Sequence, residues 1–210
     1  MTALSVSDLL KFANLQLAAE ALLNRPESNE QLFVGSDLRR GLAEGNNRSL
    51  KFTQTQAETF AADWIVLAQK STTTGFSGTL FYNTKTFERV LSFRSTEFID
   101  DHARDNQATN AMELAEGGFA LGQIADMEAW YKTLAADPEM LKGQVFSVTG
   151  YSLGGHLATT FNLLRQQEAQ AGQALPGAPS AKHSGGGTAV GDFPPICLAL
   201  DTSCPKHLNP

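Results

Sequence analysis

The chain has 210 residues, of which 42% are hydrophobic and 18% charged, and its formal net charge is −6. This composition is typical of a globular domain and excludes a chain that is disordered throughout. A negative charge without a basic cluster argues against nucleic acid as a partner, because phosphate binding needs gathered Lys and Arg side chains. No run approaches the roughly 20 apolar residues of a transmembrane segment. Two cysteines, Cys197 and Cys204, are too few for a zinc framework or a disulfide-rich mini-fold.

The N-terminal part is expected to be a helix. Residues 5–8 have the pattern of a capping box, and apolar residues follow it to Leu22. The same segment carries Asp8 and Lys11 and lacks a positively charged start, so it does not resemble a secretory signal. We therefore expect either a cytoplasmic protein or one exported by a route without a conventional N-terminal signal.

A second helix is predicted after a polar stretch, residues 24–50, to which we assign no element. Residues 55–58 have the pattern of another capping box. The apolar residues that follow keep the spacing of one helical face. They are Ala57, Phe60, Ala61, Trp64, Ile65 and Ala68.

The pattern then changes to short β-rich runs. Residues 78–82 and 87–93 predict a hairpin with a four-residue loop. A helix is expected over residues 120–135, and the short, near-continuous β run 144–149 predicts a strand in a sheet that is covered on both faces. A further helix is expected to begin directly after this strand and to fade near Gln170.

Residues 150–154 read Gly-Tyr-Ser-Leu-Gly and match the Gly-x-Ser-x-Gly nucleophile elbow. In an elbow, a serine on a sharp strand-to-helix turn exposes its hydroxyl, and the flanking glycines let the backbone approach itself closely. The following helix directs free N–H groups at the same place, which suits an oxyanion. Since the motif lies between a β run and a helical stretch, we interpret Ser152 as a nucleophile; the alternative is a structural turn.

A second feature accompanies the elbow. The strand over residues 87–93 ends in Arg94, Ser95 and Thr96, roughly 55 positions before the serine. Hydrolases often place their other oxyanion donor at such a strand end, although polar residues can also simply cap a strand. Because the polar strand end and the elbow follow each other in the order found in hydrolases, a chance match is less favoured.

With these motifs, the segment from about Gly78 to Leu164 resembles the fungal-lipase-like family, the class 3 lipases of the α/β-hydrolase fold. Members of that family carry an oxyanion motif of Phe-Arg-Gly followed by Ser or Thr, then a lid-bearing segment, a Gly-Phe turn, a helix and the elbow. This chain has residues 93–96, residues 118–119 and the elbow in that order. It departs from the family at Ser95, where a glycine is usual.

The resemblance implies a role for several residues. Ser152 would be the acyl-accepting nucleophile, and Thr96 with the backbone N–H of Leu153 would form the oxyanion hole. Residues 98–112 would occupy the position of the lid.

A catalytic serine also needs a base and an orienting acid. The order serine, acid, histidine of α/β-hydrolases argues against His102, which precedes the serine. His156 lies one turn after Ser152 on the same predicted helix and is interpreted as a packing or capping residue. Asp201 followed by His207 keeps the required order.

The surroundings of Asp201 add a second resemblance. The acid lies between Cys197 and Cys204, with His207 soon after, which is similar to cutinases, where a short disulfide loop contains the catalytic Asp. The remaining histidine, His183, lies in the same Gly- and Pro-rich tail. The alternative is that this tail does not belong to the fold, so that the domain is truncated after its elbow and Ser152 is poorly activated.

The sequence thus predicts an α/β-hydrolase-like fold, with a short mixed sheet, N-terminal helices and an irregular tail. Residues 1–170 form the domain and residues 171–210 the tail.

The expected activity is hydrolysis of a lipid or other acyl ester, without a cofactor or metal. For the acidic residues 100–105, a solvated loop is favoured over a metal site. A catalytically dead binding module, a thioesterase and a peptidase remain alternatives. The oligomeric state is left open.

Overall fold

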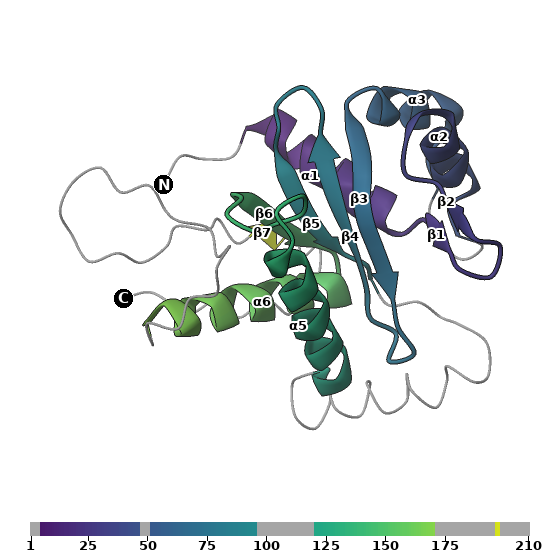
Figure 1. Cartoon of the computed structure of the whole chain (residues 1–210). Helices are drawn as coiled ribbons and strands as arrows, with labels where there is room; N and C mark the ends of the chain where they lie inside the picture. The colour runs from purple at the N-terminus through teal and green to yellow at the C-terminus, as the bar shows by residue number, and fades with distance from the viewer. Residues whose placement is uncertain (1–4, 47–50, 96–119, 171–195, 198–210) are drawn as a thin grey trace.

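A mixed β-sheet forms the centre of the fold (Figure 1). The computed structural model describes residues 5–46, 51–95, 120–170 and 196–197. Within them the sheet has five strands in the order β3-β4-β5-β6-β7. The first three are antiparallel to one another, whereas β6 is parallel to both β5 and β7. The strands are β3 (Trp64–Ser71), β4 (Ser77–Asn83), β5 (Arg89–Phe93), β6 (Phe146–Gly150) and β7 (Ile196–Cys197).

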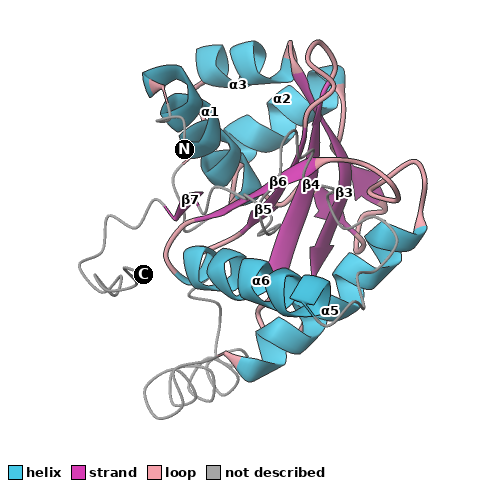
Figure 2. Cartoon of the chain, turned by 90° about the vertical axis from the view of Figure 1, so that its left-hand side faces the viewer, coloured by secondary structure: helices cyan, strands magenta, loops and turns pink. Residues whose placement is uncertain are grey.

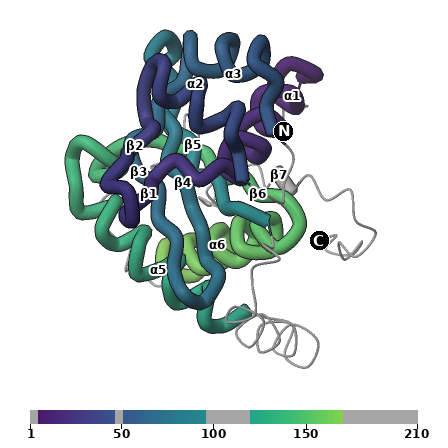
Figure 3. The backbone as a smooth tube through the Cα atoms, turned by 90° about the vertical axis from the view of Figure 1, so that its right-hand side faces the viewer, coloured from purple at the N-terminus to yellow at the C-terminus, as the bar shows by residue number. Residues whose placement is uncertain are grey.

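Helices cover the sheet on both faces (Figure 2). One face carries α1 (Val6–Ala19), α2 (Gly35–Glu44) and α3 (Gln54–Ala61), and the other carries α5 (Leu121–Ala136) and α6 (Leu153–Gln170). In Figure 3 the N-terminal helices and the green helices α5 and α6 lie on opposite sides of the strands. The α/β class with a mixed sheet and N-terminal helices is therefore confirmed. A separate two-stranded sheet pairs β1 (Asn24–Arg25) with β2 (Glu30–Gln31).

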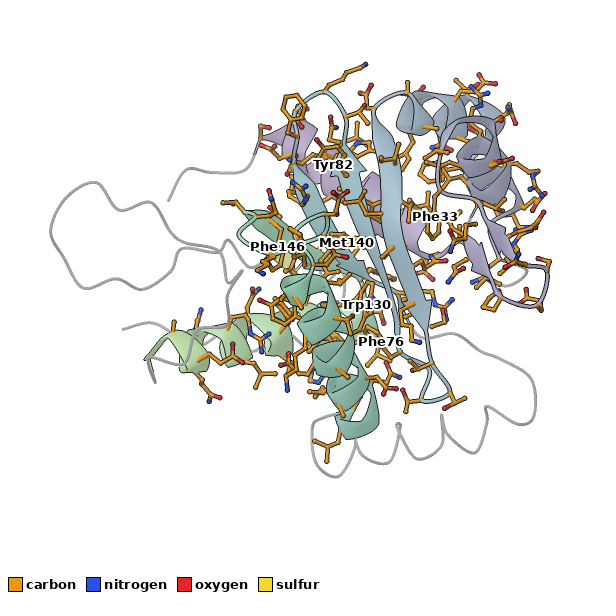
Figure 4. All side chains as sticks on the ribbon, in the orientation of Figure 1. Phe33, Phe76, Tyr82, Trp130, Met140 and Phe146 are labelled. Carbon is orange, nitrogen blue, oxygen red and sulfur yellow. The ribbon has the colours of Figure 1, made fainter. Side chains whose placement is uncertain are left out.

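The two apolar cores lie on either side of the sheet because successive strand residues point to opposite faces. Val90 belongs to the core under α1, α2 and α3, and its neighbour Leu91 belongs to the core under α5 and α6. In this second core, the ring centroids of Phe76 and Trp130 are 5.9 Å apart (Figure 4). On β6, Phe146 and Val148 also belong to this second core, and Thr149, which follows Val148 along the strand, is fully buried as well.

Helix α1 begins as its sequence predicts. The Ser5 hydroxyl accepts a hydrogen bond from the Asp8 N–H at 3.1 Å, and the Asp8 carboxylate accepts one from the Ser5 N–H at 3.2 Å. This reciprocal capping box satisfies two of the N–H groups that a helix start leaves without an intrahelical acceptor. The first predicted helix start is confirmed.

The helix predicted over residues 55–68 is wrong in its second half. Helix α3 ends at Ala61, and β3 begins at Trp64. The capping box is also two residues earlier than predicted, since Thr53 and Gln56 form it. The helical spacing gave the wrong prediction because the residues from Trp64 onward also suit a strand. Their pairing with β4 along the whole strand decides their conformation.

Most of the later elements are confirmed. Strands β4 and β5 form the predicted hairpin, although β5 starts at Arg89, two residues later than expected, because Phe87 has a positive φ of 63°. Helix α5, strand β6 and helix α6 lie where the sequence predicts them. The polar stretch 24–50, to which no element was assigned, contains β1, β2 and α2.

A buried ion pair joins α6 to α5. The Arg165 guanidinium donates to Glu128 at 2.5 Å and to Glu168 at 2.9 Å, and it lies over the Tyr131 ring at 4.5 Å. The Arg165 side chain is only 3% exposed. Such a pair is costly to break on one side only, because the remaining charge stays buried. It holds α6, the helix that follows Ser152, against α5.

The tail prediction falls mainly outside the described residues. Of residues 171–210, the structure describes Ile196 and Cys197, which form β7 and pair with the end of β6. The boundary at residue 170 stays a prediction. Among the described helices, none combines the length and the apolar character that crossing a bilayer requires.

Candidate active site

Ser152 lies at a sharp turn between β6 and α6. Strand β6 ends at Gly150 and α6 begins at Leu153, so two residues make the whole connection. Ser152 has a φ of 54°, a left-handed conformation that L-residues with a side chain seldom adopt. The residue is exposed, and its neighbour Tyr151 is 45% exposed. Backbone strain held at an exposed hydroxyl is a feature of functional turns.

Two glycines make this turn possible. A Cβ on Gly150 would lie 2.1 Å from the Gly154 carbonyl oxygen, and a Cβ on Gly154 would lie 2.2 Å from the Phe93 carbonyl oxygen. Both distances are far inside van der Waals contact, and the atoms met belong to backbone that cannot rotate away. The two flanking glycines of the motif are therefore required by close backbone approach, which is the reason for their spacing around the serine.

The first turn of α6 points its N-terminus at this place. The Ser152 carbonyl accepts the His156 N–H at 3.1 Å, which is the first helical hydrogen bond after the turn. The amides ahead of it, Leu153 among them, belong to the first-turn N–H groups that have no intrahelical acceptor. These donors, together with the positive end of the helix dipole, favour a developing negative charge beside Ser152.

The end of β5 lies next to the turn. Phe93 is the register partner of Gly150 in the parallel pair, so both strand ends finish side by side. After Phe93 the chain is held at two points: the Arg94 N–H donates to the Ser77 carbonyl, and the Ser95 N–H donates to Glu20 Oε1, each at 3.0 Å. The predicted oxyanion residue Thr96 follows directly but lies outside the described residues.

Helix α1 also contributes a side chain, that of Gln16, to the region of the turn. The sequence patterns did not indicate this residue. Gln16 is buried, and its Nε2 donates to Thr149 Oγ1 at 2.6 Å and to the Gly150 carbonyl at 3.3 Å. A signal was present in the sequence, because Gln16 interrupts the apolar face that Phe12 and Leu15 form on this helix. A polar residue on a buried face needs a partner, and here the partner is the strand that leads into the elbow.

His156 is the only histidine among the described residues. It is partly buried on the first turn of α6, and this burial lowers the pKa of its imidazole below the ordinary value of 6.5. Desolvation disfavours the charged form, so the side chain is held neutral near pH 7. Its half-buried place on the helix agrees with the packing role expected from sequence.

The other predicted site residues lie outside the described part of the chain. They are Thr96, His102, His183, Asp201, His207, Cys204 and the lid segment 98–112. Cys197 is described only as part of β7, so its pairing with Cys204 stays a prediction. Within the described residues, no group of three or more His, Cys, Asp or Glu side chains could hold a metal ion.

Comparison with known proteins adds little at the level of sequence. No protein-family model matches the chain, and no curated protein matches it. A solved structure described as that of a fungal lipase is similar over 79% of this chain, with a TM-score of 0.42 and 20% sequence identity. This chain spans 60% of the length of that protein. The geometry of the chain's own residues therefore has to carry the assignment of function.

Proposed function

We propose that this protein is a serine hydrolase of carboxylic esters, lipase- or esterase-like, that forms an acyl-enzyme on Ser152. The observation that carries the proposal is the left-handed backbone of Ser152, exposed between a buried strand and the N-terminus of a helix. The clash that any Cβ would cause at Gly150 and Gly154 supports it. A turn of this kind presents a hydroxyl and unpaired amides at the same place, as acyl transfer needs.

In the proposed reaction, the Ser152 hydroxyl attacks the ester carbonyl and passes its proton to a histidine. The oxyanion that forms accepts hydrogen bonds from the Leu153 N–H and from Thr96. Collapse of this intermediate expels the alcohol, which takes up the proton, and leaves the acyl group on Ser152. A water molecule then attacks the acyl-enzyme by the reverse proton path and releases the acid.

The base and the acid of this scheme are proposed from the order of residues in the chain. His207 would be the base and Asp201 its orienting acid, as the resemblance to cutinases implies. The substrate class is a lipid or other acyl ester, and the chemistry needs no cofactor. Thioesters and peptides are alternative substrates, because the same turn serves all acyl transfer through serine.

A serine-reactive fluorophosphonate tests the proposal directly. We expect the intact protein to gain the mass of one phosphonyl group, located on Ser152 by peptide mapping, and the Ser152→Ala variant to gain none. Absence of labelling on a folded wild-type chain would contradict the proposed activity and favour a hydrolase-like binding module. Circular dichroism of both proteins provides the control for folding.

A substrate panel then separates the reaction classes. We expect p-nitrophenyl esters to be cleaved and the Ser152→Ala variant to lose at least about 1,000-fold in kcat, as removal of a catalytic nucleophile does. Cleavage of thioesters alone or of peptides alone would replace the ester assignment by a thioesterase or a peptidase.

A further inference from the structure

We propose that Gln16 of α1 and Glu20, the C-cap residue that follows this helix, are positioning residues that hold the ends of β6 and β5 in a fixed register around Ser152. The functional part of this inference rests on the proposed serine hydrolase. Gln16 lies on α1, which covers the sheet on the face opposite α6, and Glu20 directly follows the last residue of that helix. Each of them contacts one of the two strand ends that flank the serine.

The first contact fixes the strand that leads into the elbow. Gln16 is 8% exposed, and its amide nitrogen donates both to Thr149 Oγ1 at 2.6 Å and to the Gly150 carbonyl at 3.3 Å. Gly150 is two residues before Ser152, and Thr149 is fully buried. Since hydrogen bonds in a buried, low-dielectric region are costly to leave unmade, this end of β6 has little freedom to move.

The second contact fixes the strand that leads to the predicted oxyanion residue. The Glu20 carboxylate accepts the Ser95 N–H at 3.0 Å, a charge-assisted hydrogen bond. Glu20 is itself held, since its backbone carbonyl accepts the Asn46 side-chain amide at 3.1 Å. The backbone at Ser95, the last described residue before Thr96, is therefore held in place.

The two contacts act together because of helix geometry. Residues four apart lie on the same face of a helix, separated by about 6 Å along its axis. Neighbouring strands of a sheet are about 4.8 Å apart. One helix face can thus contact two adjacent strand ends at once, with Gln16 on β6 and Glu20 beyond β5. The rigid helix then sets the distance between the end of β6 and the chain at Ser95.

The same helix provides a matched control at its other end. Lys11 forms an ion pair with Glu88 at 2.9 Å, near the amino end of β5 and away from Ser152. Lys11→Met removes the ion pair of α1 with Glu88, as Gln16→Met removes the hydrogen bonds of α1 with Thr149 and Gly150, and it leaves the elbow untouched. Glu20→Gln supplies the conservative control, because its amide oxygen can still accept the Ser95 N–H.

Steady-state kinetics on a p-nitrophenyl ester test the proposal. We expect Gln16→Met and Glu20→Ala to lower kcat by about 100-fold with little change in KM, since misplacement of reacting groups by about 1 Å has an effect of this size. Glu20→Gln should restore most of kcat, and Lys11→Met should leave it unchanged. A kcat for Gln16→Met within about twofold of that of Lys11→Met, with both variants folded, overturns the proposal.

Amide hydrogen exchange keeps this test independent of catalysis. In Gln16→Met we expect faster exchange at the His156 amide, which bonds to the Ser152 carbonyl, and no such change in Lys11→Met. If the wild-type chain is not labelled on Ser152 by the fluorophosphonate, the proposed activity fails and the exchange result alone decides the positioning role. Equal protection of His156 in both variants overturns it.

Discussion

A residue with a left-handed backbone follows the carboxyl end of β6, and another precedes the amino end of β5, but the surroundings of the two residues differ. At the carboxyl ends Ser152 has a φ of 54°, and the close approach of Gly154 to Phe93 fixes the turn. Near the amino end of β5, Phe87 has a φ of 63° in the hairpin connection and is 69% exposed.

The polar contacts of α1 differ in the same way. At the carboxyl ends, Gln16 makes buried hydrogen bonds to the strand that leads into the turn. Toward the amino end, the Lys11–Glu88 ion pair is partly exposed to water. Exposed pairs of this kind contribute little to stability, whereas buried contacts define a unique geometry. A strained residue is thus informative about function only where the surrounding backbone and buried contacts enforce it.

The largest effect is expected from adding one methyl group at the carboxyl end. In Gly154→Ala the new Cβ would meet the Phe93 carbonyl oxygen at 2.2 Å, so the first turn of α6 must move away from β5. We expect a loss of about 3 kcal/mol in the free energy of unfolding, measured by urea denaturation, because overpacking against backbone has no flexible neighbour to relieve it.

A glycine before β6 provides the control. Gly143 also has a positive φ, 71°, but a Cβ there would meet no atom within 4 Å. Gly143→Ala should therefore lose only the left-handed penalty of about 1 kcal/mol. Equal losses in the two variants would show that the carboxyl end is no more tightly packed than the segment before β6.

A smaller effect is expected from relieving strain at the two left-handed residues. Replacement by glycine removes the steric penalty of a positive φ, whereas replacement by alanine retains it. We expect Ser152→Gly to be more stable than Ser152→Ala by about 1 kcal/mol, and Phe87→Gly to exceed Phe87→Ala by a similar amount. Thermal and urea unfolding of the four variants measure both differences.

Labelling by the fluorophosphonate distinguishes the roles of Ser152 and Phe87. Both Ser152 variants should lose fluorophosphonate labelling, while both Phe87 variants should keep it. Loss of labelling in Phe87→Gly, in a protein that remains folded, would contradict the view that the hairpin connection has no part in the site.

The smallest expected effect concerns pH. Burial lowers the pKa of His156 in the folded chain, so between that value and about 6.5 the unfolded chain binds the proton more readily. The stability associated with neutral His156 is present above pH 6.5 and is lost as the pH falls through this window. We expect the free energy of unfolding to decrease less between pH 7.5 and pH 5 in His156→Gln than in the wild type. Parallel pH profiles would contradict the assignment.

Local patterns predicted several elements well. The capping box of α1, the hairpin of β4 and β5, and the succession from β6 to α6 each depend on residues close together in the chain. The spacing of residues 57–68 was compatible with a helix throughout. It failed after Ala61 because pairing with β4 made a strand of the residues from Trp64 onward. Pairing between strands is a property of the folded chain that a local spacing does not contain.

In the candidate site, too, the local motif could be predicted from the sequence and the long-range contacts could not. The Gly-x-Ser-x-Gly motif located the turn, since its five residues are contiguous and its glycines are needed for the approach of backbone to backbone. The contacts of α1 were not predicted, because Gln16 and Thr149 are 133 positions apart and Glu20 and Ser95 are 75 apart. No local pattern indicates which distant strand end a buried amide will meet.

Five contiguous residues were enough to predict where this chain turns sharply and which residue is exposed there, because steric limits on a glycine-flanked serine act over a few bonds. The position of the β5 end against that turn, and the contacts of both strand ends with α1 and its C-cap residue, followed from the folded chain alone. Those relations depend on the packing of α1 across the sheet, and packing joins residues that the order of the chain keeps far apart.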